Sequence, residues 1–244
     1  MAIVPSGTPV EPINKGLLNM IERLPSGIPG LDEVMEGGFP TPSVILLLGD
    51  PGTGKTTFAM QSLFFGAKSG EPVIYMTGVA EPIFMIKKFM SAFTFYEEKL
   101  VEGGRVQFWD LGTSIATMGP KKALDAITEI VKETRASRVI IDPLPLAQLF
   151  SSPVDYRKYL YEFLTALRNL QVLVIIVGEE GDAGARNLEA YMVDAVVILT
   201  LKTLDNPLIF KNFIRIAKMR GTNHTRDVMS VELTEDGMSV FRME

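Results

Sequence analysis

The segment that most constrains the fold of this chain is an eight-residue, glycine-rich run that directly follows a short apolar stretch. Residues 49–56, GDPGTGKT, match the pattern G-x-x-x-x-G-K-[ST] at every fixed position, and the apolar residues 44–48 precede them. Glycines let the backbone curl so that several N–H groups point at phosphate oxygens, and a helix that begins near Lys55 adds the positive end of its dipole. The run therefore predicts a strand, a phosphate-binding loop and a helix, in that order.

Three polar side chains are predicted to complete a nucleotide site around this loop. Lys55, the expected catalytic residue, is placed to reach the β- and γ-phosphates of the nucleotide. The Thr56 hydroxyl is placed to bind Mg²⁺. Asp142 ends the largely apolar run 138–141, and in a doubly wound sheet the carboxyl ends of such strands surround the ligand. We therefore expect Thr56 and Asp142 to be magnesium ligands; the alternative for Asp142 is a cap on the turn before Pro143. The chain has no Asn-Lys-x-Asp guanine motif, which favours ATP as the nucleotide.

The pattern of apolar residues along the rest of the chain predicts an α/β fold. The run 172–177 is continuously apolar, which requires that both faces of its strand are covered, as in a parallel sheet flanked by helices. Alternation of such strands with amphipathic helical segments is typical of a doubly wound sheet. No helix separates the last four expected strands, so we expect them to form an antiparallel extension. The expected strands are 43–48, 73–77, 106–110, 138–142, 172–177, 193–201, 209–217, 228–233 and 238–242, and the expected helices are 55–69, 82–91, 121–135 and 155–170.

The composition excludes several classes of site. Among 244 residues there is no cysteine and one histidine, so disulfides, iron–sulfur clusters, cysteine nucleophiles and multi-histidine metal sites are ruled out. A net charge of -5 does not favour a broad nucleic-acid-binding surface. No apolar run approaches the roughly 20 residues that cross a bilayer, and no signal peptide is recognised, so we expect a cytoplasmic protein without membrane insertion. Residues 1–22, with three prolines, are predicted to be an N-terminal arm, and residues 23–244 a single domain.

Several further segments resemble the KaiC branch of the RecA-like ATPases, over residues 22–242. The lead-in to the loop, LPSGIPGLDE followed by GGFP, is similar to that of the family. Asp142 matches its Walker B aspartate, DAVVIL at 194–199 resembles its D-x-V-V-x-L strand, and KMRGTNH at 218–224 resembles its K-x-R-G-T-x-H element. The last element is the most specific, and RadA-type recombinase paralogues and DnaB-type helicases fit it less well. The resemblance implies a RecA-like P-loop fold, with a mostly parallel twisted sheet flanked by helices and a C-terminal antiparallel extension.

The resemblance also implies a ring, usually a hexamer, with nucleotide bound between subunits. Lys218 and Arg220 would then reach the γ-phosphate of a neighbouring subunit, and the turn with Thr222 and His224 would contact nucleotide as well. From the residues alone, the alternative is that Lys218, Arg220 and Arg226 are solvated charges on an edge strand. The candidate nucleotide-contacting residues are Gly49, Asp50, Pro51, Gly52, Thr53, Gly54, Lys55, Thr56, Thr57, Asp142, Lys218, Arg220, Thr222 and His224.

The sequence departs from the family at the position that activates the attacking water. The strand after the first helix usually ends with two glutamates in this family, and here Val79 and Ala80 occupy those positions. Glu81 is displaced by about 6–7 Å along an extended chain, whereas a general base acts within about 3 Å or through one water. Glu179 and Glu180 are a second acidic candidate, ranked below Glu81. We therefore predict ATP binding with weak or absent hydrolysis, and Glu81 as the candidate catalytic carboxylate.

These features predict a nucleotide-dependent signalling or scaffold module that self-assembles into a homohexamer and has an unknown protein partner. The loops expected to face a central pore, 143–153 and 178–190, carry one basic residue between them, Arg186, so DNA binding is not expected. The alternatives are an active ATPase motor, a RadA-paralogue-type accessory protein of recombination that binds DNA, and a structural subunit whose loop no longer binds ATP.

Overall fold

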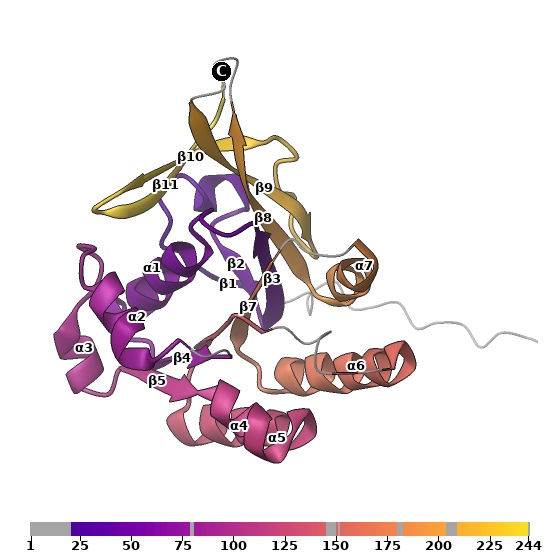
Figure 1. Ribbon diagram of the computed structural model, residues 1–244. Coiled ribbons are helices and arrows are strands. Elements are labelled where there is room, and N and C mark those ends of the chain that lie inside the picture. Colours follow the sequence, from indigo (N-terminus) through magenta and orange to yellow (C-terminus); the bar gives the residue numbers. More distant parts are fainter. Residues whose placement is uncertain are drawn as a thin grey trace, which may run out of the picture.

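The computed structural model describes residues 21–78, 81–144, 150, 152–179, 183–203 and 209–243, without the side chains of residue 124 and residues 183–187. Helices cover both faces of a large sheet (Figure 1). The strands are β1 (Glu22–Leu24), β2 (Phe39–Thr41), β3 (Ser43–Gly49), β4 (Val73–Thr77), β5 (Val106–Asp110), β6 (Arg138–Asp142), β7 (Leu173–Glu179), β8 (Ala195–Thr203), β9 (Phe210–Met219), β10 (Met229–Thr234) and β11 (Gly237–Phe241). The helices are a 3-10 turn η2 (Asp32–Val34), α1 (Lys55–Lys68), α2 (Ile83–Met90), α3 (Glu98–Glu102), α4 (Leu111–Met118), α5 (Pro120–Thr134), α6 (Pro153–Asn169) and α7 (Ala183–Met192).

The large sheet has nine strands in the order β11-β10-β9-β8-β3-β7-β6-β4-β5, and β1 pairs with β2 in a separate two-stranded sheet. Neighbouring strands are parallel from β8 through β3 to β5, and antiparallel from β8 to β11. This confirms the predicted mostly parallel sheet with a C-terminal antiparallel extension. The extension begins one strand later than expected, because β8 still pairs in parallel with β3 and only β9 reverses the direction.

The central strand β3 is buried on both of its faces. Ile45 and Leu47 pack into one hydrophobic core together with Phe58 and Phe64 of α1. The alternate residues of β3 pack into a second core together with Phe163 of α6. In Figure 1 these two helices lie on opposite sides of the strand. Burial on both faces explains why this strand is continuously apolar.

Every predicted helix and strand is present within two residues of its expected bounds, but several short elements were not predicted. The clearest case is α4, whose sequence LGTSIATM contains a glycine and β-branched residues of low helix propensity. The Asp110 carboxylate caps this helix by accepting the Thr113 N–H at 2.9 Å, and bonds with Thr113 lower the pKa of Asp110. A cap at one end therefore compensates for weak propensity. No helix in the described ranges has the length and hydrophobicity needed to cross a bilayer.

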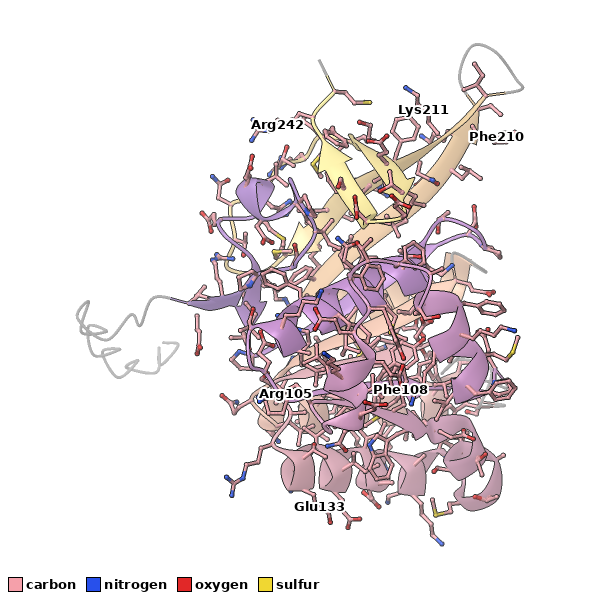
Figure 2. All side chains as sticks on the ribbon, turned by 90° about the vertical axis from the view of Figure 1, so that its left-hand side faces the viewer. Arg105, Phe108, Glu133, Phe210, Lys211 and Arg242 are labelled. Carbon is pink, nitrogen blue, oxygen red and sulfur yellow. The ribbon has the colours of Figure 1, made fainter. Side chains whose placement is uncertain are left out.

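The edge strand β5 and the tip of the inner strand β9 are covered unequally. Phe108 of the edge strand β5 packs against the Tyr75 ring, with a centroid distance of 5.6 Å, and under the Lys87 ammonium at 5.0 Å. On the other side of the sheet, Phe210 at the start of β9 is 60% exposed. Figure 2 shows Phe210 and Lys211 at the far tip of the long β9 strand. The tip of the β8–β9 pair thus projects beyond the helical layers.

A completely buried arginine at the start of β6 ties three other segments to the sheet. Arg138 Nη2 forms an ion pair with Glu71 Oε1 at 3.1 Å and also donates to the Pro25 carbonyl oxygen at 3.1 Å. Its Nη1 donates to the carbonyl and hydroxyl oxygens of Ser62 on α1 at 2.7 and 2.8 Å. Burial lowers the pKa of Arg138, and the Glu71 carboxylate opposes that effect. Because loss of one partner leaves a buried charge uncompensated, this pair is expected to matter strongly for stability.

Candidate nucleotide site

The loop between β3 and α1 has a backbone shape that depends on its glycines. Gly52 and Gly54 have φ angles of +83° and +90°, in the left-handed region that favours glycine. A Cβ on Gly49 would lie 2.6 Å from the Leu199 carbonyl oxygen, so close packing against β8 also requires glycine there. The helix α1 begins directly at Lys55. Strand, loop and helix therefore follow one another in the order expected from the motif.

Lys55 points back into the curl of this loop. Its Nζ donates hydrogen bonds to the carbonyl oxygens of Gly49 at 2.8 Å and Asp50 at 2.9 Å. Partial burial lowers the pKa of Lys55, and the carboxylates of Glu179, Asp142 and Asp50 oppose that effect. A cation held over a glycine-rich loop at a helix N-terminus is a suitable ligand for a polyphosphate.

Asp142 and Thr56, which we expected to be magnesium ligands, come together at the end of β6. Asp142 is 5% exposed, and its carboxylate accepts hydrogen bonds from the Tyr75 hydroxyl at 2.8 Å and from Thr56. Burial raises the pKa of Asp142, whereas these two bonds and the charge of Lys55 oppose the rise. Hydroxyl and carboxylate oxygens fit the site of a Mg²⁺ ion that keeps waters and phosphates as its other ligands. Among the described residues there is no cluster of three or more acidic, histidine or cysteine side chains that could hold a metal without such partners.

Glu81 lies at the same edge of the sheet, after β4, and is exposed. Burial is the main cause of the raised pKa values of Asp142 and Tyr75, and the charge of Glu81 adds to the rise in both. Its carboxylate therefore acts electrostatically on the Tyr75–Asp142 pair. Val79 and Ala80 lie outside the described residues, so the replacement of a catalytic pair by these two side chains stays a prediction.

Glu179 brings a second exposed carboxylate to this edge. Because β7 pairs in parallel with β3, Glu179 stands opposite Gly49 in the strand register. Of the charges that oppose the lowering of the Lys55 pKa, that of Glu179 is the largest. Glu180 lies outside the described residues. Two acidic groups thus flank the candidate site, Glu81 on the Asp142 side and Glu179 on the Lys55 side.

The cationic element at the end of β9, with Lys218 in the strand and Arg220 just after it, lies toward the other edge of the sheet. The Arg220 N–H donates to the Asp194 carbonyl oxygen at 2.9 Å, and the Asp194 N–H donates to the Val44 carbonyl oxygen at 2.9 Å. Along β3, Val44 and Gly49 are separated by about 16 Å at the usual rise of a strand. One chain therefore does not bring Lys218 and Arg220 to its own phosphate loop.

The side chains of Arg220, Thr222 and His224 in this second element each have a polar partner within the chain. Arg220 forms an ion pair with Asp194 at 3.0 Å. Thr222 Oγ1 accepts a hydrogen bond from Arg23 at 3.0 Å, and His224 Nδ1 lies 2.8 Å from the Thr225 carbonyl oxygen. The strand β9 is an inner strand, flanked by β8 and β10. The edge-strand part of the alternative is therefore wrong, whereas the Arg220 side chain, just after β9, is 54% exposed.

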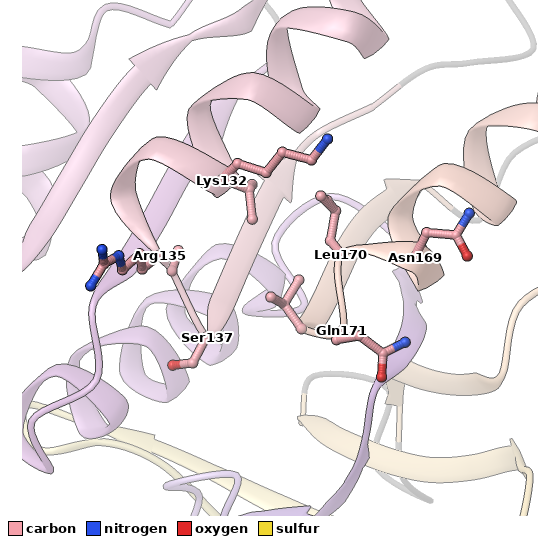
Figure 3. A pocket seen from close by; sticks show the side chains of 9 residues that line it. Lys132, Arg135, Ser137, Asn169, Leu170 and Gln171 are labelled. Carbon is pink, nitrogen blue, oxygen red and sulfur yellow. The ribbon is translucent and has the colours of Figure 1, made fainter.

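A separate pocket of about 390 Å³ lies between the ends of α5 and α6 (Figure 3). No residue of the expected nucleotide site lines it. It opens at the amino ends of β6 and β7, whereas ligands of doubly wound sheets bind outside the carboxyl ends. The pocket is therefore not the nucleotide site. Its lining residues are Val131, Lys132, Arg135, Ala136, Ser137, Asn169, Leu170, Gln171 and Val172.

Comparison with known proteins agrees with this geometry. The protein-family model described as "ATPase: KaiC" matches residues 24–244. The chain belongs to the KaiC ATPase family. A UPF0273 protein of Thermotoga maritima is 30% identical over 242 residues, which cover 92% of this chain and 98% of that protein. The circadian clock oscillator protein KaiC of Prochlorococcus marinus is 25% identical over 95% of this chain, and the match covers 47% of that longer protein.

Solved structures include a crystal structure of a KaiC-like protein from Pyrococcus horikoshii. It has a TM-score of 0.79 and 31% identity, and the match covers 91% of this chain and 100% of that one. Membership of the KaiC family supports an ATP-binding protein of the RecA fold, as the motifs predicted.

Some residues of the two sites were missed by the sequence analysis. Arg168 and Arg23 bond to side chains 26 and 199 positions away, so no local pattern marks them. Tyr75 offered a clue, because a tyrosine within a buried strand needs a partner for its hydroxyl group. The spatial order of the strands, which sequence patterns did not specify, makes Asp142 that partner.

Proposed function

We propose that this chain binds ATP with Mg²⁺ and assembles into a ring in which each nucleotide lies between two subunits. The observation that carries the proposal is the separation of the phosphate loop from Lys218 and Arg220 along the sheet. In a head-to-tail contact, the cations of one subunit face the loop of the next. Repetition of such a contact gives a ring when the rotation closes. A homohexamer is the ring that the family resemblance implies.

Each group of the site has a role in this proposal. Lys55 binds the β- and γ-phosphates, while Thr56 and Asp142 hold the magnesium ion. When bound, Mg²⁺ supplies charge neutralisation between the phosphate oxygens. Lys218 and Arg220 of the neighbouring subunit form charge-assisted hydrogen bonds with the γ-phosphate. Residues 23–244 constitute the ATP-binding domain, and residues 1–22 an arm.

Hydrolysis in this proposal is weak or absent. Val79 and Ala80 stand where the family usually has two glutamates, and neither side chain accepts a proton. Loss of a positioned base typically costs about 10²–10⁴-fold in rate. The nucleotide then acts as a bound signal, and the ring as a signalling or scaffold module for a protein partner.

An active ATPase is the second candidate function. The exposed carboxylates of Glu179 and Glu81 favour it, since they lie on the Lys55 and Asp142 sides of the site. In that case one of them activates the attacking water in place of the missing pair.

Single-turnover hydrolysis of Mg²⁺–ATP, with bound nucleotide quantified in the same sample, tests these candidates. Lys55→Ala is the control, and it should bind little ATP. Stoichiometric binding with little product supports the proposal, whereas rapid product formation supports the motor. Sedimentation velocity with and without ATP tests the ring. Absence of ATP binding by the unmodified chain contradicts both candidates and favours a structural subunit.

A further inference from the structure

The pocket between the ends of α5 and α6 has apolar walls and one lysine directed across it. The buried residues Val131, Ala136 and Val172 contribute to the walls, and none of the described residues that line the pocket is acidic. Figure 3 shows the Lys132 side chain extending from α5 toward Leu170, at the end of α6. Its ammonium group has no acceptor among the described residues. The volume of about 390 Å³ lies within the usual range of small-molecule sites, about 300–1,000 Å³.

Both turns that border this pocket contain a non-glycine residue in the left-handed region. Arg135 follows α5 with a φ of +53°, and Gln171 comes after α6 with a φ of +58°, whereas helices that end in this way usually have glycine there. Among the described residues, Glu36 is the only other non-glycine residue with a positive φ. The residues before them, Thr134 at the end of α5 and Leu170, have right-handed conformations. A right-handed residue followed by a left-handed one forms a nest, a concavity of successive N–H groups that binds anions.

The residue after each left-handed position is buried and has an unpaired N–H group. Ala136 is 3% exposed and Val172 is 7% exposed, and neither N–H has a hydrogen-bond partner in the described part of the chain. In a helix that ends at a left-handed residue, this N–H commonly pairs with a carbonyl oxygen of the last turn. Buried N–H groups without a partner are rare, so an acceptor from outside the chain is expected. Both groups lie at the same end of the sheet, because Arg138 and Leu173 stand opposite each other in β6 and β7.

We propose that this pocket is a second ligand site, which binds a small carboxylic acid with an aliphatic body. The carboxylate accepts hydrogen bonds from the N–H groups of Ala136 and Val172 and from the Lys132 ammonium, while the aliphatic body packs against the apolar walls. Figure 3 shows Arg135 pointing away from Lys132, so one cation faces the ligand. The carboxyl ends of α5 and α6 carry partial negative charge, which disfavours a ligand with several negative charges. The site depends neither on the proposed ring nor on its nucleotide.

Calorimetric titration of the full-length chain with hexanoate tests the ligand class. Hexanoate should bind saturably, hexylamine, with the same body and the opposite charge, should not bind, and acetate, without the body, should bind more weakly by about 10-fold or more. Lys132→Gln should weaken hexanoate binding by about 10-fold or more, because a hydrogen bond to a charged group is lost. Lys121→Gln, which changes an exposed lysine at the other end of α5, is the matched control and should have no effect. Absence of hexanoate binding, binding of hexylamine, or unchanged affinity in Lys132→Gln overturns the proposal.

Two substitutions at one position test the role of the backbone. Arg135→Gly and Arg135→Val both remove the guanidinium group, but glycine retains the left-handed conformation and the branched side chain of valine opposes it. Arg135→Gly should therefore keep the affinity for hexanoate and the melting temperature, whereas Arg135→Val should lower both. In NMR titrations of the unmodified chain, hexanoate should shift the amide signals of Ala136 and Val172 and leave those of Gly52 and Gly54 in place. Equal losses of affinity in the two variants, or unshifted signals of Ala136 and Val172, contradict binding by these N–H groups.

Discussion

The Tyr75 hydroxyl donates a hydrogen bond to Asp142 Oδ2 at 2.8 Å, and both side chains are almost fully buried. The bond joins β4 to β6, which are neighbours in the sheet. Burial raises the pKa of Asp142, and the bond from Tyr75 is the largest influence that opposes the rise. A buried tyrosine on β4 thus helps to set the charge and direction of a proposed magnesium ligand.

Tyr75→Phe is expected to weaken Mg²⁺-dependent binding of ATP by about 5- to 150-fold, because the buried carboxylate loses a donor at a cost of about 1–3 kcal/mol. The pKa of Asp142 should rise further. Asp142 must be ionised to hold Mg²⁺. As the pH is lowered, the Tyr75→Phe variant should therefore lose Mg²⁺–ATP binding at a higher pH than the unmodified protein does. Calorimetric titrations of Mg²⁺–ATP across the acid range check this shift.

Tyr159→Phe is the matched control, because the Tyr159 hydroxyl also donates a hydrogen bond, partly buried, to the Pro120 carbonyl oxygen at 2.8 Å. It should cost stability without moving the pH dependence of binding. If Tyr75→Phe and the unmodified protein lost Mg²⁺–ATP binding at the same acidic pH, the Tyr75 hydroxyl would not control the pKa of Asp142.

Glu71→Gln and Arg138→Met should each lower the free energy of unfolding by about 3–5 kcal/mol, because either change breaks a buried ion pair. The double variant should lose less than the sum, since no buried charge is then left without a partner. Urea unfolding measures all three. The Lys68–Glu97 pair, 2.9 Å apart and largely exposed, supplies the control, and Glu97→Gln should cost about 0–1 kcal/mol. Strict additivity of the two buried substitutions would contradict this prediction.

Arg23→Ala should destabilise the turn that follows β9. Arg23 donates to the Gly221 carbonyl oxygen at 3.3 Å and the Thr222 hydroxyl at 3.0 Å, and to two carbonyl groups of the lead-in segment. We expect a loss of about 1–3 kcal/mol in the free energy of unfolding. Glu36→Gln removes only the half-exposed ion-pair partner of Arg23 and should cost about 0–1 kcal/mol. Equal losses in the two variants would assign the effect to the ion pair instead.

Glu81→Gln is expected to remove whatever ATP hydrolysis the chain retains, by about 10²-fold or more, without loss of ATP binding. Glu179→Gln is the matched comparison, because it removes the other exposed carboxylate at this edge. Single-turnover rates and nucleotide affinities of both variants decide between them. A loss confined to Glu179→Gln would place the base on the Lys55 side of the site.

The sequence predicted most of the fold because strands such as β3 and β7 are buried on both faces and are therefore continuously apolar. It predicted the phosphate loop because the φ angles of Gly52 and Gly54 require glycine, which leaves a local pattern. The elements that it missed depend on tertiary contacts or caps, as α4 depends on Asp110. The fixing of Arg220 by Asp194 was missed because strand order brings these residues together.

The phosphate loop and Arg220 lie far apart on a single chain, and this has a consequence for dilute solutions. In the proposed ring, a chain below the concentration at which copies associate carries only half of each binding site. Because ligand and partner copies then bind together, the apparent affinity for ATP should strengthen as protein concentration rises. The fraction of sites that hold ATP would then depend on the concentration of the protein itself. A change in expression level alone would change that fraction.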